Sequence, residues 1–230
     1  MFNVILPTYN ESGCIVTTIN MLDRVFKELN RPYLLVIVDD NSPDGTSDIV
    51  KALGSDSIKV VDRPGKMGLG SAYMDGLEHC VYPYTVIMDS DLQHDPFAII
   101  DMYKMAGKGF DIVSGSRYSG GGSVSHRSFV RGLVSCTANN LARYTLGLNA
   151  TDLTGSFRLY KTDVLRSLMG KTRCRRFGFQ MEILARAEAA GCSIAECPIV
   201  FYTRKTGESK ISSAEVLFFL AAVAQLYFTM

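Results

Sequence analysis

Two acidic side chains and one amide, each separated by a single residue, follow an apolar run near the middle of the chain. Asp89, Asp91 and Gln93 come directly after Val86–Met88, in the segment VIMDSDLQH. Neighbouring anionic carboxylates repel each other unless a cation lies between them. Mg²⁺ and Mn²⁺ take hard oxygen ligands, a few from protein and the rest from water and phosphate. We therefore predict a divalent-metal site here; the alternative is a solvated turn with helix-capping aspartates.

Two other apolar runs end in polar residues that suit ligand binding. Phe2–Leu6 leads into an aromatic ring and an acid, Tyr9 and Glu11, and Leu34–Val38 leads into an acidic turn at Asp40. A carboxylate at Asp40 can accept hydrogen bonds from a base edge or a ribose, but a turn residue bonded to its own backbone is nearly as consistent. Ligands in open α/β sheets bind at the carboxyl ends of strands. The polar residues after these two runs and after Val86–Met88 therefore all indicate one binding site.

The elements that must position these residues alternate between short apolar runs and helix-period segments. This pattern is typical of a mostly parallel sheet covered by helices. The expected strands are Phe2–Leu6, Leu34–Val38, Ile58–Val61, Thr85–Met88 and Asp111–Ser114. The expected helices are Ile15–Leu29, Arg131–Leu146 and Gln180–Ala190. We predict one α/β, Rossmann-like domain, with a mobile glycine-rich loop at Ser119–Ser125.

The composition is that of an ordinary globular protein. Apolar residues make up 47% of the 230 residues, and the net charge of +1 argues against a protein built to coat nucleic acid. The six cysteines form no CxxC pair, so we expect thiols in a reducing compartment rather than a zinc site. The start of the sequence lacks a basic segment and a cleavage site, and we expect no signal peptide.

The last segment, residues 213–230, has a different character. Ser212 and Glu215 resemble a capping box, and Val216–Phe228 is apolar on nearly every face. A membrane span needs about 20 apolar residues, so this helix is too short to cross a bilayer. A buried core helix is one interpretation. We favour the other, a C-terminal apolar helix that lies in the membrane interface or docks on a membrane partner.

Six motifs in order carry a family resemblance: LPTYNE, VDDNSPDGT, KMGLGSAY, MDSDLQH, SGSRY and DLTGSFRLY. Together they resemble the family-2 glycosyltransferases of GT-A fold, and within them the dolichyl-phosphate mannose synthases, with residues 1–212 as the catalytic domain. The resemblance implies transfer of mannose from GDP-mannose to dolichyl phosphate with inversion. It implies a peripheral enzyme on the cytosolic face of the endoplasmic reticulum that supplies lipid-linked mannose for protein glycosylation and GPI anchors.

The resemblance also assigns roles to residues. Those implied to hold the guanosine end of the donor are Pro7, Tyr9, Glu11, Val38 and Asp40. Asp89, Asp91 and Gln93 are implied to bind Mg²⁺ or Mn²⁺, with Ser90 near the donor. The implied catalytic residues are Asp91, Arg117 and Arg131.

Basic residues are implied to meet phosphates on both substrates. Arg117 and Arg131 match positions that meet the lipid phosphate, with Ser135 one turn from Arg131 on the same helix face. Arg204 and Lys210 match a loop that closes on the donor diphosphate. Guanidinium forks suit phosphate oxygens, and a glycine-containing loop can move to enclose them.

Two acids outside the metal motif are open to more than one interpretation. A phosphate monoester has a second pKa near ~6 and is already an anionic nucleophile, so no strong base is required. Glu182 is then either an assisting acid or, as we expect, an acid on a helix surface. Asp152 either orients the acceptor or caps the turn before Gly155. The basic run 171–176 is more consistent with a solvated face than with a lipid-binding patch.

The resemblance favours the form that small partner proteins hold at the membrane, because anchored members continue into transmembrane helices. Two other functions stay open: a sister enzyme that uses UDP-glucose, and a non-catalytic subunit that binds nucleotide sugars. The retained acids and arginines argue against the second. A dehydrogenase is disfavoured because no GxGxxG follows the first strand.

Overall fold

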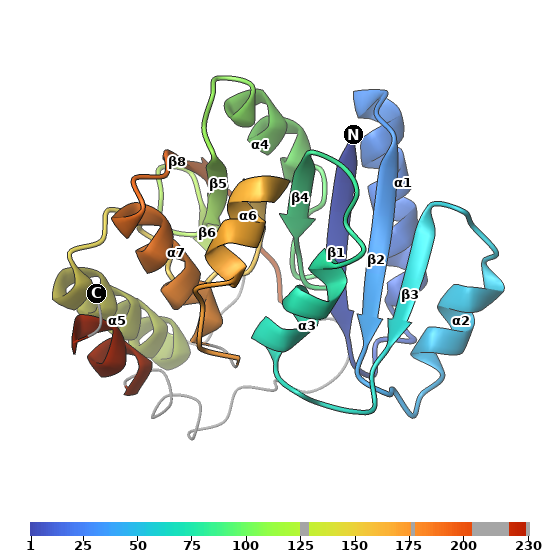
Figure 1. Ribbon diagram of the computed structural model, residues 1–230, viewed down its shortest axis with the longest axis horizontal. Coiled ribbons are helices and arrows are strands. Elements are labelled where there is room, and N and C mark those ends of the chain that lie inside the picture. Colours follow the sequence, from blue (N-terminus) through green and yellow to red (C-terminus); the bar gives the residue numbers. More distant parts are fainter. Residues whose placement is uncertain (125–128, 176–177, 204–220, 229–230) are drawn as a thin grey trace.

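A seven-stranded sheet forms the centre of the computed structural model (Figure 1). The structure describes residues 1–124, 129–175, 178–203 and 221–228, without side chains for 129–135. In the described residues the strand order is β3-β2-β1-β4-β7-β5-β8. The strands are β1 Phe2–Thr8, β2 Tyr33–Asp39, β3 Ile58–Asp62, β4 Tyr84–Ile87, β5 Ile112–Ser116, β7 Arg158–Lys161 and β8 Ile194–Pro198. All neighbours are parallel except β7, which is antiparallel to β4 and β5.

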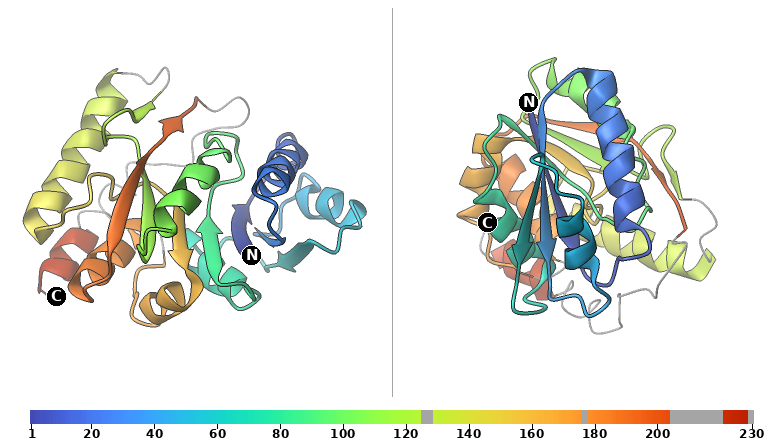
Figure 2. Two further views of the ribbon diagram at one scale, coloured as in Figure 1. Left: turned by 90° about the horizontal axis from the view of Figure 1, so that it is seen from above. Right: turned by 90° about the vertical axis from the view of Figure 1, so that its right-hand side faces the viewer.

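Helices cover both faces of the sheet. They are α1 Ile15–Leu29, α2 Thr46–Ala52, α3 Leu69–Leu77, α4 Ala98–Ala106, α5 Phe129–Leu146, α6 Thr162–Met169 and α7 Phe179–Ala189. α1 and α4 lie on one face, whereas α3, α6 and α7 lie on the other (Figures 1 and 2). Each face therefore has its own apolar core, and the sheet separates the two.

The alternation of side chains along β1 explains the two cores. Ile5 points into the core under α3, and its neighbours Val4 and Leu6 point into the core under α1. All three are fully buried. On the face that α3 covers, this helix approaches β1 closely at Gly76, where an added Cβ would lie 2.6 Å from a methyl group of Ile5. Only glycine permits this contact.

The site residues converge at one edge, the lower edge of the sheet in Figure 1. β1, β2, β3, β4 and β5 are parallel, so their carboxyl ends all lie there. β7 runs the other way, so its first residue, Arg158, lies at the same edge. After β1 the chain continues to β2 on one side of β1 and later returns to place β4 on the opposite side of β1, so the strand order reverses between β1 and β4. Ligands of open α/β sheets bind at such a switch point.

The five predicted strands and the three predicted helices are all confirmed, with ends that differ by at most three residues. β7 and β8 were not predicted. The predicted glycine-rich loop contains a short strand, β6 Ser123–Val124, which pairs with β9 Val200–Phe201. β7 is only four residues long and begins and ends with a charged residue, and β8 contains a glutamate and a proline. Neither segment therefore has the apolar run by which a buried strand is recognised in a sequence.

The described part of the C-terminal segment, residues 221–228, is helical. Val223 and Leu226 are buried in the core that also holds Ala142 of α5, whereas Tyr227 and Phe228 are exposed. The rest of the predicted helix lies outside the described residues. Among the described helices, none is both long enough and apolar enough to cross a membrane.

Candidate active site

The turn after β4 is fixed by the serine between its two acids. Ser90 is 2% exposed, and its hydroxyl donates a hydrogen bond to the carbonyl of Pro7 at 3.1 Å. Its own carbonyl accepts from the Thr18 hydroxyl at 3.0 Å. The side chain of Ser90 thus points into the protein, and the expectation that Ser90 lies near the donor stays a prediction. The turn continues through Leu92, whose φ of 61° is rare for a leucine, so the backbone of this turn is strained.

Asp89 is oriented by a residue that the sequence did not single out. The Ser156 hydroxyl donates to Asp89 Oδ2 at 2.7 Å, and His94 Nε2 lies 3.5 Å from the same oxygen. The Asp89 side chain keeps about a third of its surface exposed, at 34%. The carboxylate is therefore held from beneath while it remains accessible to a ligand.

Asp91 and Gln93 form the outer part of the same turn. Asp91 Oδ1 accepts a hydrogen bond from the Gln93 backbone N–H at 3.1 Å. Gln93 Nε2 donates to the Tyr202 carbonyl at 3.0 Å, and the Tyr202 N–H donates to the Gln93 carbonyl at 2.8 Å. Since its nitrogen is engaged, the amide of Gln93 has its oxygen left to offer a cation.

These three residues fit a divalent cation that is shared with a ligand. In the described part of the chain, no three His, Cys, Asp or Glu side chains form a complete metal centre. A site with two carboxylates and one amide is what Mg²⁺ or Mn²⁺ needs when phosphate and water complete its coordination. The inward turn of Ser90 leaves Asp89 and Asp91 on the outer side.

The acidic pair after β2 has divided roles. Asp39 is 1% exposed and accepts hydrogen bonds from the Ser42 N–H at 2.8 Å, the Ser42 hydroxyl at 2.7 Å and the Thr8 hydroxyl at 2.9 Å. It is the turn residue. Asp40 keeps 16% of its side chain exposed and lies 2.8 Å from Arg63 Nη1. Asp40 is thus the member of the pair that a ligand can reach.

The other residues implied to hold the nucleoside differ in what they expose. The Lys66 ammonium lies over the Tyr9 ring, 3.6 Å from its centre, which places a cation at this edge. Glu11 is 6% exposed. Val38 is fully buried, and its side chain packs against Gly76 of α3. The Pro7 carbonyl is already engaged by a hydroxyl.

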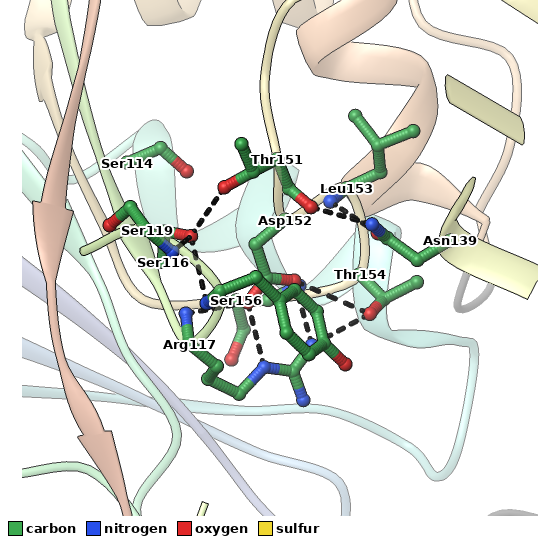
Figure 3. A network of polar contacts seen from close by, with 12 residues as sticks. Ser114, Ser116, Arg117, Ser119, Asn139, Thr151, Asp152, Leu153, Thr154 and Ser156 are labelled. Atoms are coloured by element: carbon green, nitrogen blue, oxygen red, sulfur yellow. Dashed lines mark hydrogen bonds and ion pairs between the residues drawn. The ribbon is translucent and has the colours of Figure 1, made fainter. Parts of the chain in front are cut away.

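An ion pair joins the loop after β5 to the loop before β7. Arg117 Nε donates to Asp152 Oδ2 and its Nη2 to Asp152 Oδ1, both at 2.7 Å (Figure 3). Nη2 also donates to the Thr154 hydroxyl at 2.7 Å. The Arg117 side chain is 9% exposed and that of Asp152 is fully buried. Arg117 is therefore at the predicted edge, in a pre-formed fork with Asp152.

Asp152 caps the turn before Gly155, one of the two interpretations that the sequence left open. Its Oδ1 accepts from the Gly155 N–H at 3.0 Å. That Asp152 orients the acceptor stays a prediction; the contact that the structure gives it on that side is the pair with Arg117. Burial pushes the pKa of the Asp152 carboxyl up, but the hydrogen bonds and charge of Arg117 outweigh burial and leave this pKa below its ordinary value. The pair is thus ionised at neutral pH.

Glu182 is not the exposed helix acid that we expected. It is 3% exposed, and its carboxylate accepts the backbone N–H groups of Arg173 at 3.0 Å and Cys174 at 2.6 Å. Arg186 completes the arrangement, with Nε 2.7 Å from the same carboxylate. The residue fixes the segment before α7, because a buried carboxylate needs such donors.

Four residues that the resemblance implies remain untested. Arg131 and Ser135 lie in the first part of α5, residues 129–135, for which the structure describes the backbone and no side chains. Arg204 and Lys210 lie outside the described residues.

The fold defines an α/β protein with a mostly parallel sheet, in which two acids follow the strand beside the switch point. The sequence matches the model of glycosyl transferase family 2 over residues 3–169. The chain therefore belongs to glycosyl transferase family 2.

Two relatives match nearly the whole chain. Polyprenol monophosphomannose synthase of Mycolicibacterium smegmatis is 32% identical over 220 residues, which cover 93% of this chain and 82% of that protein. Undecaprenyl-phosphate mannosyltransferase of Micrococcus luteus is 35% identical over 218 residues, which cover 92% of this chain and 88% of that protein.

Solved structures share the fold. Glucosyl-3-phosphoglycerate synthase from Mycobacterium tuberculosis in complex with UDP superposes with a TM-score of 0.73 at 20% identity, covering 99% of this chain and 80% of that one. The same enzyme with Mn²⁺ and UDP-glucose gives a TM-score of 0.74 at 19% identity, with 99% and 79% covered. At this identity the likeness establishes the GT-A architecture alone.

Proposed function

We propose that this chain is a polyprenyl-phosphate mannosyltransferase that moves mannose from GDP-mannose to the phosphate of dolichyl phosphate, with inversion at the anomeric carbon. The observation that carries the proposal is the convergence at one sheet edge of the accessible acids Asp89 and Asp91 with the Arg117–Asp152 fork. The two relatives support the reaction class, because their names give mannose as the sugar and a polyprenyl phosphate as the acceptor.

The donor side of the site begins at the ends of β1 and β2. Asp40 supplies an accessible acceptor for the nucleoside, and the Tyr9 ring with Lys66 above it supplies an aromatic surface and a positive charge. Asp89, Asp91 and the Gln93 amide oxygen would hold Mg²⁺ or Mn²⁺ beside the diphosphate. Such a cation neutralises the charge that builds on a departing GDP. Arg204 and Lys210 are assigned to the same diphosphate by the resemblance.

The acceptor side needs cations and no strong base. A phosphate monoester is already anionic at neutral pH, so one of its oxygens can attack the anomeric carbon as the bond to GDP breaks. Arg117 is nearly covered and paired with Asp152, so it offers the lipid phosphate the remaining face of a pre-oriented guanidinium. Arg131 on α5 is the second cation that we assign to this phosphate.

The acceptor places the enzyme at a membrane surface. We assign it to the cytosolic face of the endoplasmic reticulum as a peripheral protein, where its product serves protein glycosylation and GPI anchors. Residues 213–230 would contact the membrane interface or small anchoring subunits. Tyr227 and Phe228, with side chains 61% and 83% exposed, support this role because they present aromatic surface to the solvent.

The test is transfer of radiolabelled mannose from GDP-mannose to dolichyl phosphate, with and without divalent cation. We expect cation-dependent labelling of the lipid. Asp91→Ala should reduce it at least about a hundredfold, since a metal supplies several kcal/mol and each 1.4 kcal/mol is tenfold. The matched control is Asp101→Asn, an exposed acid on α4 that should leave turnover unchanged.

Further arms of the same assay separate the alternatives. Labelling from UDP-glucose in place of GDP-mannose would identify the sister enzyme. Equal labelling of undecaprenyl phosphate would assign a broader acceptor class. Donor binding without transfer to either lipid would identify a non-catalytic binding subunit and refute the proposal.

A further inference from the structure

Arg63, the first residue after β3, is a buried cation with three neighbours of different kinds. Its side chain is 3% exposed. Nη1 lies 2.8 Å from Asp40 Oδ1 and Nε lies 3.0 Å from Asp75 Oδ2, while Nη2 donates to the Ser71 hydroxyl at 2.6 Å. The backbone N–H of Arg63 donates to the Asp39 carbonyl at 2.8 Å. The guanidinium is thus held from the end of β2 and from α3.

The contact between Arg63 and Asp40 is close without being a hydrogen bond. Arg63 Nε and Nη1 and Asp40 Oδ1 are buried atoms with no hydrogen-bond partner among the described residues. Their distances are those of ion pairs, but the angles are unfavourable for hydrogen bonds. Buried polar groups that are not hydrogen-bonded are costly, and such groups point to a functional requirement.

The pairing divides the Asp40 carboxylate into an inner and an outer part. Oδ1 faces Arg63 and is buried, so the 16% of the side chain that remains exposed belongs to its other atoms. Burial raises the pKa of Asp40, and Arg63 opposes this rise. The other charged groups that act on Asp40 are Asp39 and Asp75, which raise its pKa, and Lys66, which lowers it.

We propose that Arg63 is a positioning residue that keeps Asp40 ionised, with Oδ1 turned inward and Oδ2 available to the nucleoside of the donor. This inference rests on the proposed function, because it refines the donor site. Arg63 itself does not meet the donor: its side chain is buried beneath the edge, and it acts through Asp40. The hydrogen bond from Arg63 to Ser71 links Asp40 to the start of α3, because the Ser71 hydroxyl also donates to the carbonyls of Met67 and Gly68.

The test measures GDP binding by calorimetry between about pH 4 and pH 8, a range that spans Asp titration. Loss of a cation near a carboxylate raises that carboxyl's pKa. In Arg63→Gln, affinity should therefore fall at a higher pH than in the wild type as the pH is lowered. Arg63→Lys retains the charge and should restore most of the wild-type profile.

Asp75→Asn gives a result of opposite sign and guards against a folding failure of Arg63→Gln. Asp75 is 40% exposed, so its replacement leaves the core intact. It removes a negative charge that raises the pKa of Asp40, so the loss of affinity should move to a lower pH. If Arg63 were purely structural, the pH profile of folded Arg63→Gln would match that of the wild type.

A double-mutant cycle tests whether Arg63 acts through Asp40. In an Asp40→Asn background, Arg63→Gln should cause little further loss of GDP affinity, because the group that it positions is gone. Full additivity, or pH profiles that match the wild type in every variant, would overturn the inference. A wild-type chain that binds no GDP would instead contradict the proposed donor, so the two failures are distinguishable.

Discussion

The Ser156 hydroxyl donates a hydrogen bond to Asp89 across 2.7 Å, although 67 positions separate the two residues in the chain. The antiparallel register of β4 and β7 explains their meeting. Ile87, the last residue of β4, lies opposite Arg158, the first residue of β7. Continuing this antiparallel register by two residues past each strand end places Asp89 opposite Ser156. The antiparallel strand β7 thus places the serine that orients Asp89, the acid after β4.

Replacing Ser156 by alanine should raise the Mn²⁺ concentration that transfer requires, or lower turnover, by about 10- to 100-fold, the usual effect of losing a hydrogen bond to a metal ligand. Ser156→Thr keeps the hydroxyl and should retain most activity. The measurement is transfer rate as a function of Mn²⁺ concentration. Ser167→Ala, at an exposed position on α6, is the control. An unchanged Mn²⁺ requirement in Ser156→Ala would contradict this role.

The Arg117–Asp152 fork should be important for stability as well as for the acceptor. Asp152→Ala leaves a buried guanidinium without its partner, which costs about 3–5 kcal/mol. Adding Arg117→Gln to this variant should recover part of the loss, because the uncompensated charge is removed. Urea unfolding of the single and double variants measures both values. Additive losses would show that the two side chains do not depend on each other.

A second carboxylate makes stability depend on pH outside the site. Lys161 Nζ lies 2.8 Å from Asp111 Oδ1, and Ser193 donates two hydrogen bonds to Oδ2, so the pKa of Asp111 is lowered from 3.8 to about 2. The folded pKa lies below the unfolded one, so this stabilisation is complete above about pH 4 and is lost as the pH falls towards 2.

The measurement for Asp111 compares the free energy of unfolding of wild type and Asp111→Asn at neutral and acidic pH. The pair is partly exposed, so screening limits the neutral-pH difference to about 1 kcal/mol. This difference should shrink as the solution is acidified. Asp163→Asn, at a side chain that is 96% exposed, is the control and should not change the pH dependence. A constant difference at all pH values would show that Asp111 does not act through its charge.

If Arg131 binds the lipid phosphate as we propose, Arg131→Ala should raise the acceptor KM by about tenfold or more and leave donor binding nearly unchanged, because a charged hydrogen bond would be lost. The assay varies dolichyl phosphate at saturating GDP-mannose, while GDP binding is measured separately. Equal losses for both substrates would contradict the assignment of Arg131 to the acceptor.

The sequence predicted the sheet, its main helices and the edge that gathers the site, because these follow from apolar periodicity and from polar residues at strand ends. It also located Asp40, Asp89, Asp91 and Arg117 at this edge. These are local patterns, each confined to a strand and the few residues after it.

The features that the sequence left open depend on distant partners. The inward direction of Ser90 is set by Pro7 on another strand, and the burial of Glu182 is set by backbone groups before α7. Ser156 and Arg63 are recognisable as supporting residues only once β7 and β3 have been placed beside their neighbours. Such contacts join segments far apart in the chain, and no periodicity records them.

The most direct test of the account is calorimetric titration of the GDP-bound protein with Mn²⁺, for the wild type and for Asp91→Asn. Each chain's unfolding temperature confirms that the variant is folded. We predict clear binding to the wild type and a loss of about a hundredfold or more in affinity for the variant. Equal Mn²⁺ affinity in both proteins, or no Mn²⁺ binding to the wild type in the presence of GDP, would contradict the assignment of the acids after β4 as the metal site.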